Sequence, residues 1–306
     1  MKHNTHIYLA AKAIEFLYEG MGNLRYAKSG KTVPSKLLRE KRASAKTLQR
    51  MLMHYQQVIS EATWAPDDIL NDKSQFHTFK LYTDAEFLGG VVYAKEVHKE
   101  KYYRAKGGGG LPYKVDHLSR VIADMDKLRR YNDRCSMEQI MYQYLMISHY
   151  IVDANVPMHC DLRDDPPSEN DTKKPKNGLY FKGTLHGKIE KEWEKAVNPI
   201  AIKEEIIELS REKDDTPPTD LSPEIVFHVT DPDHVALIRP VQISSNSLMN
   251  YMIDLCILTK ERSLQLFPIV DPNAWTKEDL KAHTRPVFTD TISALISVWM
   301  WIWDKT

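Results

Sequence analysis

The sequence predicts an all-α fold, and three observations support this prediction. Apolar residues recur at helical spacing along most of the 306 residues, whereas alternation with a period of two is scarce. Hydrophobic residues make up 42% of the chain and charged residues 27%, which is ordinary for a globular protein with a substantial core. No internal repeat is visible, so a solenoid is not expected. We therefore expect a single helical domain over residues 1–306.

The first expected helix covers residues 5–19, with Asn4 or Thr5 as its cap and an apolar face that begins at Ile7. Periodicity predicts further helices at residues 43–62, 86–104, 115–130, 136–154, 184–195, 200–212, 242–266 and 285–303. Two segments favour strands instead: IVFHVT (225–230) and VALIRPVQI (235–243). Polar or glycine-rich stretches predict surface loops at 105–114, 163–178 and 213–224.

Charge and cysteine content exclude several classes of protein. The 42 basic and 42 acidic residues cancel, which disfavours a nucleic-acid-coating surface, so an anionic substrate would be held locally by a metal or a small basic cluster. Three cysteines without a CxxC spacing argue against a disulfide framework. No apolar run reaches roughly 18 residues, and the first segment lacks the apolar region of a signal peptide. We expect a cytoplasmic protein, or a secreted one if the start is a processed terminus.

The C-terminal segment LISVWMWIW (295–303) is rich in Trp and allows two interpretations. Such a segment could lie on a membrane surface as an amphipathic helix. However, it has no Lys or Arg on a polar face, which favours a helix packed in the core.

The strongest chemical signal is the spacing H-x3-D-x5-H formed by His149, Asp153 and His159. In a helix the first two side chains share a face, and Pro157 would end that helix just before His159. With 12 histidines in 306 residues, this pattern is uncommon by chance. Neutral imidazole and carboxylate bind zinc at about 2.0–2.2 Å, so a metal site competes with the simpler interpretation of hydrogen-bonded core histidines.

A second helical pair, His186 and Glu190, stands in LHGKIEKEW. Its spacing again places both side chains on one helix face, although a charged segment like this one is more often a solvated surface. Two metal ions about 3.5–4 Å apart can share a hydroxide and hold a phosphoryl group during in-line attack, and a carboxylate such as Asp153 can bridge them.

HYIVDANVPMH (149–159) resembles the central motif of the zinc-dependent phospholipase C and P1/S1 nuclease superfamily, which reads HYLGDxxQPMH. HIYLAAKAIEFL (6–17) is similar to the family's first helix, and TWAPDDILNDKSQFHTF (63–79) to its Pro-Asp turn and His-aromatic segment. The helical His-x3-acid pair follows these in the same order. Val152 replaces the glycine that usually precedes the central aspartate, and the region after residue 195 shows no clear match.

The resemblance implies an all-α phospholipase C/P1 nuclease-like domain that binds up to three zinc ions. One ion would be held by Asp67, His77, His149 and Asp153, and a second by His159, His186 and Glu190. The third would use His6, the bridging Asp153 and the terminal residue, here Met1, with His3 as the rival ligand. Asp68 is the alternative to Asp67, which is preferred because the family ligand follows Pro.

The expected activity is that of a zinc-dependent phosphoric ester hydrolase, most simply a phospholipase C-type phosphodiesterase that uses a metal-bridging hydroxide. Asp67 is the candidate catalytic residue, and Trp64, Phe79 and Tyr82 are candidates for contacting the substrate. The expected partner is a phospholipid or another phosphate ester, with transient membrane-surface contact and no stable nucleic-acid partner. One alternative is a P1/S1-type single-strand nuclease or 3′-nucleotidase, and another is an inactive metal-stabilised binding module.

Overall fold

Helices dominate the structure, as the sequence predicts. The computed structural model describes residues 2–27, 29–72, 74–83, 93–98, 102–105, 108–164, 184–197, 232–244 and 247–306. Its α-helices are α1 (His3–Gly20), α2 (Ser35–His54), α3 (Ile59–Asp68), α4 (Leu111–Asn132), α5 (Met137–Ala154), α6 (Pro157–Cys160), α7 (Thr184–Ala196), α9 (Pro232–Leu237), α10 (Leu248–Leu266), α11 (Lys277–Ala282) and α12 (Thr284–Trp303). Its strands are β1 (Arg25–Tyr26), β2 (Leu81–Tyr82), β3 (Tyr93–His98), β4 (Tyr102–Ala105) and β5 (Val241–Gln242).

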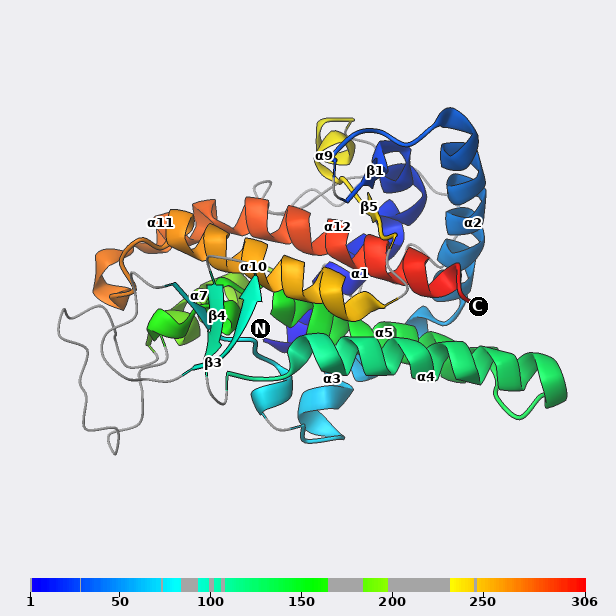
Figure 1. Cartoon of the computed structure of the whole chain (residues 1–306), viewed down its shortest axis with the longest axis horizontal. Helices are drawn as coiled ribbons and strands as arrows, with labels where there is room; N and C mark the ends of the chain where they lie inside the picture. The colour runs from blue at the N-terminus through cyan, green and yellow to red at the C-terminus, as the bar shows by residue number, and fades with distance from the viewer. Residues whose placement is uncertain are drawn as a thin grey trace.

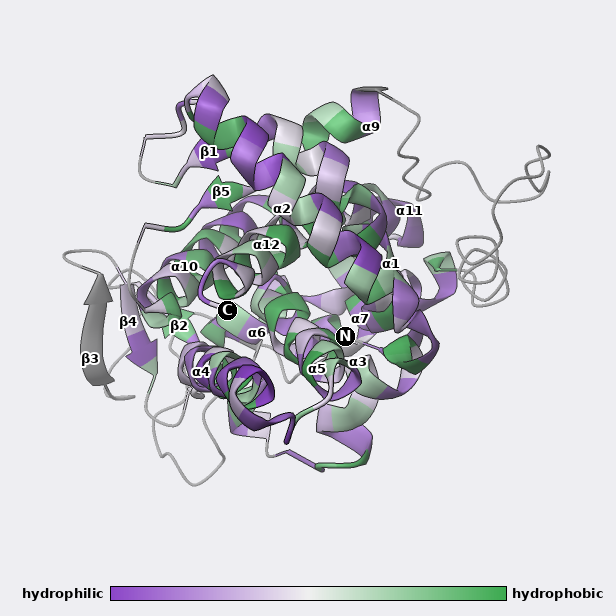
Figure 2. Cartoon of the chain, turned by 90° about the vertical axis from the view of Figure 1, so that its right-hand side faces the viewer, coloured by the Kyte–Doolittle hydropathy of each residue, from purple (hydrophilic) through white to green (hydrophobic). Residues whose placement is uncertain are grey.

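Four long helices, α4, α5, α10 and α12, lie side by side along the longest axis of the molecule (Figure 1). α1 packs against α12, α2, α3 and α5, and α7 contacts the start of α1. Seen from the end of the bundle, the outer end of α4 is largely hydrophilic (Figure 2). The arrangement surrounds α5 with other helices, which places its side chains in the interior.

α5 is the central helix, and its sequence explains both of its ends. Ser136 and Gln139 form a reciprocal capping box at its start. From Tyr144 to Ala154 every residue is buried, as expected for a helix enclosed on all sides. The helix ends at Ala154, and the short helix α6 begins at Pro157, so the predicted stop before His159 is confirmed.

The hydrophobic core contains side chains from α1 through α12. Trp299 of α12 is fully buried and donates a hydrogen bond from its indole nitrogen to the carbonyl oxygen of Tyr144 at 3.0 Å. Most residues of α12 are buried, including all of Ala294–Ile302, so the packed interpretation of the C-terminal helix is confirmed. Within the described residues, no helix is both long enough and apolar enough to cross a membrane.

The largest departure from the predicted elements concerns residues 86–104, where the expected helix is wrong. The structure forms β3 and β4 there, and β4 pairs antiparallel with both β2 and β3. The adjacent Gly89 and Gly90 disfavour a helix, and aromatic Tyr102 and Tyr103 favour a strand. Helical periodicity alone did not distinguish these possibilities.

The expected helix at 43–62 is two helices, because the chain leaves the helical region at Tyr55 before α3 begins. The expected strand at 235–243 is mostly wrong: α9 covers its start, and only β5 is extended, since Pro240 cannot donate to a ladder. α10 begins at Leu248 and not at 242, because Ser247 caps it. The expected strand 225–230 and helix 200–212 lie outside the described residues.

Gly108, Gly109 and Gly110 have a structural role that their loop assignment did not predict. Gly109 has φ +100, and a Cβ atom there would lie 2.0 Å from the carbonyl oxygen of Thr78. The amide of Gly110 donates to Gln75 at 2.6 Å, and the amide of Lys80 donates to Gly108 at 2.6 Å. This close approach holds the segment that carries His77.

Candidate metal centre

His149 and Asp153 form the middle of a buried cluster on α5, and each is 1% exposed. His149 Nδ1 lies 2.8 Å from the carbonyl oxygen of Thr63 in α3. Because a carbonyl can only accept, the proton of the neutral imidazole belongs on Nδ1. His149 Nε2 is then left with its lone pair directed into the cluster, as in histidines that bind metals.

The two carboxylate oxygens of Asp153 face different histidines. Oδ2 lies 2.9 Å from His77 Nδ1 and 3.3 Å from His149 Nε2. Oδ1 lies 3.6 Å from His6 Nε2 and 3.4 Å from His159 Nδ1. One buried carboxylate therefore separates two pairs of imidazoles, which is the arrangement expected of a ligand that bridges metal ions.

Asp67 and His77 come from the end of α3 and the loop that follows it. Asp67 Oδ1 lies 3.5 Å from His77 Nε2 and 3.7 Å from His149 Nε2. The side chain of Asp67 is 34% exposed, whereas the histidines beside it are buried. Asp67 therefore stands where this part of the cluster meets solvent. Asp68 is exposed, and Asp67 is the aspartate that meets the histidines.

His159, His186 and Glu190 form the other end of the cluster. His186 Nε2 lies 2.9 Å from His159 Nε2 and 2.8 Å from Glu190 Oε1. His159 therefore presents one ring nitrogen to this group and the other to Asp153. The His-x3-Glu spacing in α7 places both of its side chains on the face that is directed at α6.

Several buried imidazole nitrogens lack a hydrogen-bond partner within the described residues. In the cluster they are both ring nitrogens of His6, Nε2 of His77 and Nδ1 of His159; Nε2 of His283, outside the cluster, is another. The His6 ring also stacks on His149 with the ring centroids 4.0 Å apart. Burying such atoms without a partner is costly, so their convergence fits a site whose donors are completed by a metal ion.

The charge states of the cluster also suit a cation. Burial lowers the pKa of His6 well below its ordinary value and lowers that of His159 to about 4. For Asp153 burial acts in the opposite direction, but interactions with neighbours, His159 and His149 among them, lower the pKa of that carboxyl overall. Neutral imidazoles beside ionised carboxylates are the protonation states in which these groups bind metals.

His77 differs from these histidines. Burial would lower its pKa, but the hydrogen bond to Asp153 reverses this effect, and the pKa of His77 is raised overall. Glu190 is held ionised, because its bonds to His159 and His186 help to outweigh the effect of burial and lower the pKa of its carboxyl.

The structure brings together every proposed side-chain ligand except Met1, which lies outside the described residues. The donors form three groups, and within each group the ligand atoms lie within 4.8 Å of one another. The groups are His6, His149 and Asp153; Asp67, His77 and His149; and His159, His186 and Glu190. The rival ligand His3 has its Nε2 3.4 Å from Ser60 and its ring 5.1 Å from Trp64. His3 thus contacts Ser60 and Trp64 and belongs to none of these three groups.

Trp64, Phe79 and Tyr82 do not share one environment. Trp64 is half-buried, and its ring lies 5.8 Å from both His6 and His149. Phe79 is 1% exposed and belongs to the core, and Tyr82 is buried and stacks on Tyr103. The structure therefore leaves Trp64 as the candidate for contacting a substrate, and it gives Phe79 and Tyr82 packing positions.

A buried charge network behind His159 was not predicted from the sequence. Asp161 is fully buried and accepts hydrogen bonds from Lys260, Arg163 and Ser263. Arg163 also donates to the carbonyl oxygen of Phe267 at 2.9 Å, at the end of α10. The network ties the segment after His159 to α10. Sequence spacing gave no signal for it, since Lys260 and Ser263 lie about a hundred residues from Asp161.

Asp161→Asn is expected to destabilise the protein by about 3–5 kcal/mol, because it leaves two buried cations without their partner. Burial alone would raise the pKa of the Asp161 carboxyl, but Lys260 and Arg163 lower it overall. The stability that ionised Asp161 contributes is therefore fully present above the ordinary pKa of aspartate. It is lost as the pH falls through the lowered pKa of Asp161. Urea unfolding measures the change. Asp124→Asn, in an exposed pair with Lys127, should cost less than about 1 kcal/mol; equal losses would contradict the assignment.

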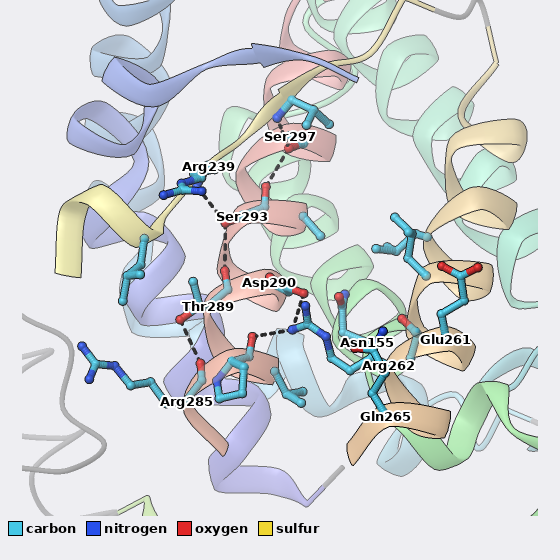
Figure 3. A pocket seen from close by; sticks show the side chains of 18 of the residues that line it. Asn155, Arg239, Glu261, Arg262, Gln265, Arg285, Thr289, Asp290, Ser293 and Ser297 are labelled. Carbon is cyan, nitrogen blue, oxygen red and sulfur yellow. Dashed lines mark hydrogen bonds and ion pairs between the residues drawn. The ribbon is translucent and has the colours of Figure 1, made fainter. Parts of the chain in front are cut away.

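A separate pocket of about 760 Å³ lies between α10 and α12 (Figure 3). Arg262 crosses it to pair with Asp290 and the carbonyl oxygen of Pro286. Asn155, the residue that follows α5, lines the pocket, whereas none of the candidate metal ligands does. The pocket is therefore distinct from the metal centre.

No protein-family model matches this chain, and no curated protein matches it. The donor atoms of the cluster therefore indicate the chemistry that it can support.

Proposed function

We propose that this protein is a zinc-dependent hydrolase of phosphate esters, with the buried histidine–carboxylate cluster as its catalytic centre. The observation that carries the proposal is the position of Asp153, whose two oxygens face separate pairs of histidines. The resemblance of HYIVDANVPMH to the phospholipase C and P1/S1 nuclease motif supports the same conclusion. On the strength of this resemblance, the proposal also identifies the all-α fold as a phospholipase C/P1 nuclease-like domain.

The ligands would fall into overlapping groups. Asp67, His77, His149 and Asp153 would hold one zinc ion; His159, His186 and Glu190 would hold a second; and His6 with Asp153 would contribute to a third. When bound, zinc lowers the pKa of water to about 7 and stabilises negative charge on phosphoryl oxygens. All of these donors are nitrogen or carboxylate oxygen, which zinc accepts.

The residues of the chain divide the remaining tasks by their exposure. Asp67 is partly exposed beside His77, so its carboxylate is placed to orient an attacking water and to accept its proton. Asp153 is buried, so it would act as a metal ligand and would not meet the substrate directly. The side chain of His186 is 31% exposed, which marks a second edge open to solvent.

The first choice of substrate is a phospholipid, which would yield a diacylglycerol-type product and a phosphorylated head group. Trp64 offers an apolar surface beside His6 and His149 for such a molecule. The same ring would suit a base that stacks beside the metals, which favours a single-strand nuclease or 3′-nucleotidase as the second candidate. A metal-stabilised binding module without activity is the third.

A panel of assays on one preparation distinguishes these functions. Zinc per folded chain is measured first, and turnover is then measured with phosphatidylcholine vesicles, single-stranded DNA and a generic phosphodiester. We expect two or three zinc ions per chain and turnover of at least the generic substrate. Preference for the vesicles would select the phospholipase, and preference for DNA would select the nuclease. Zinc without any turnover would contradict an enzymatic role, and fewer than two zinc ions would remove the basis of the proposal.

A further inference from the structure

The start of α1 is capped by a side chain from a distant helix and not by its own N-cap residue. Lys2 occupies the N-cap position and makes no side-chain bond to the helix. Glu194 of α7 takes over this role, although it lies 190 residues away. This contact explains why α1 begins two residues before the predicted start at residue 5, which assumed a local cap.

The contact satisfies two backbone amides and one hydroxyl of the first turn of α1. Glu194 Oε1 accepts from the backbone amide of Asn4 at 3.1 Å, and Oε2 accepts from the amide of Thr5 at 3.1 Å. Oε2 also accepts from the hydroxyl of Thr5 at 3.0 Å. The first-turn amides of a helix have no partner within the helix and carry partial positive charge, so an ionised carboxylate binds them well.

The contact also joins two parts of the metal centre. Glu194 stands one helical turn after Glu190, and the two share a face of α7. Thr5 is fully buried and directly precedes His6, whose ring stacks on His149. The ring of His6 makes no hydrogen bond within the described residues, so its placement depends on the backbone of the first turn of α1.

We propose that Glu194 is a positioning residue of the metal centre: it fixes the first turn of α1 and thereby holds His6 beside Asp153. The proposal rests on the proposed function, in which His6 is a zinc ligand. Glu194 touches neither the ligands nor a substrate through its described bonds, and it acts through Asn4 and Thr5. The His-x3-Glu-x3-Glu spacing of α7 therefore supplies two zinc ligands and one residue that positions a third.

The first test follows the backbone and does not depend on zinc. Hydrogen exchange of the full-length, chelator-treated protein is compared between wild type and Glu194→Gln. The amides of residues 3–9 should exchange about tenfold faster in the variant, because a charged acceptor of two amides is lost. Exchange in α5 should be unchanged. Unchanged exchange at residues 3–9, or equal acceleration throughout the chain, would overturn the proposal.

The second test follows zinc itself. Wild type and Glu194→Gln are loaded with zinc, and the release of zinc to a chromogenic chelator is timed. In the variant, one zinc ion per chain should leave at least about tenfold faster, while the others leave at the wild-type rate. Glu192→Gln, which changes a carboxylate on the same helix that pairs with Lys195, should match wild type. Identical release from Glu194→Gln and wild type would overturn the proposal.

Thr5→Val keeps the inference testable if Glu194→Gln folds poorly. Valine has nearly the volume of threonine and removes only the hydroxyl that donates to Glu194, so a smaller change in the same direction is expected in both tests. No change in either test would overturn the proposal. If wild type itself binds no zinc, the proposed function fails while the exchange result still stands, so the two failures can be told apart.

Discussion

Asp153→Asn is expected to abolish hydrolysis while the helical fold is retained. The change removes the negative charge of Asp153, which lies between His77 and His149 on one side and His6 and His159 on the other. An amide is a poor metal ligand compared with a carboxylate and cannot bridge two ions in the same way. Turnover should fall by roughly 10³-fold or more, and at least one zinc ion per chain should be lost.

Zinc content, circular dichroism and turnover of the same preparation check this expectation together. Asp126→Asn is the matched control, because Asp126 is also a buried helical aspartate but pairs with Arg129 and Arg130 on α4, away from the cluster. The control should keep its zinc and its activity even if it is less stable. An Asp153→Asn protein with full zinc content and wild-type turnover would contradict the role of Asp153.

Asp67→Asn is expected to lower kcat by about 10²–10⁴-fold, as is typical when a general base is removed. Because Asp67 is partly exposed at the edge of the cluster, the fold should not change. The buried ligands remain, so at least two zinc ions per chain should be retained. The loss should therefore appear in turnover and not in folding.

The neighbouring Asp68→Asn is the matched control, since Asp68 is exposed and lies outside the three donor groups. Kinetics of both variants at equal zinc content make the comparison. We expect kcat to fall in Asp67→Asn alone. Equal losses in both variants, or a loss only in Asp68→Asn, would assign the catalytic role differently.

The sequence could predict the central part of the fold because its signals are local there. The spacing of His149 and Asp153 and the position of Pro157 are enough to predict a helix that carries two of these side chains and stops before the third. The structure confirms that stop and shows that α5 is buried along its length from Tyr144. The pair in α7 is likewise placed on one face by its i, i+4 spacing.

Other features depend on contacts that spacing does not encode. In the segment expected as a helix at 86–104, β4 pairs with both β2 and β3, and helical periodicity cannot show this pairing. The cap of α1 comes from Glu194, and the charge network at Asp161 uses residues of α10. The different surroundings of Trp64, Phe79 and Tyr82 follow from burial, which sequence proximity to the motif did not reveal.

The most direct test of the buried zinc centre is an anomalous difference map recorded at the zinc absorption edge from crystals of the full-length protein purified without chelators. We expect at least two peaks, one beside His77 and His149 and one beside His159 and His186, each about 2.0–2.2 Å from the ligand atoms. Fewer than two peaks within the cluster, in a protein exposed to zinc, would contradict the proposed zinc centre.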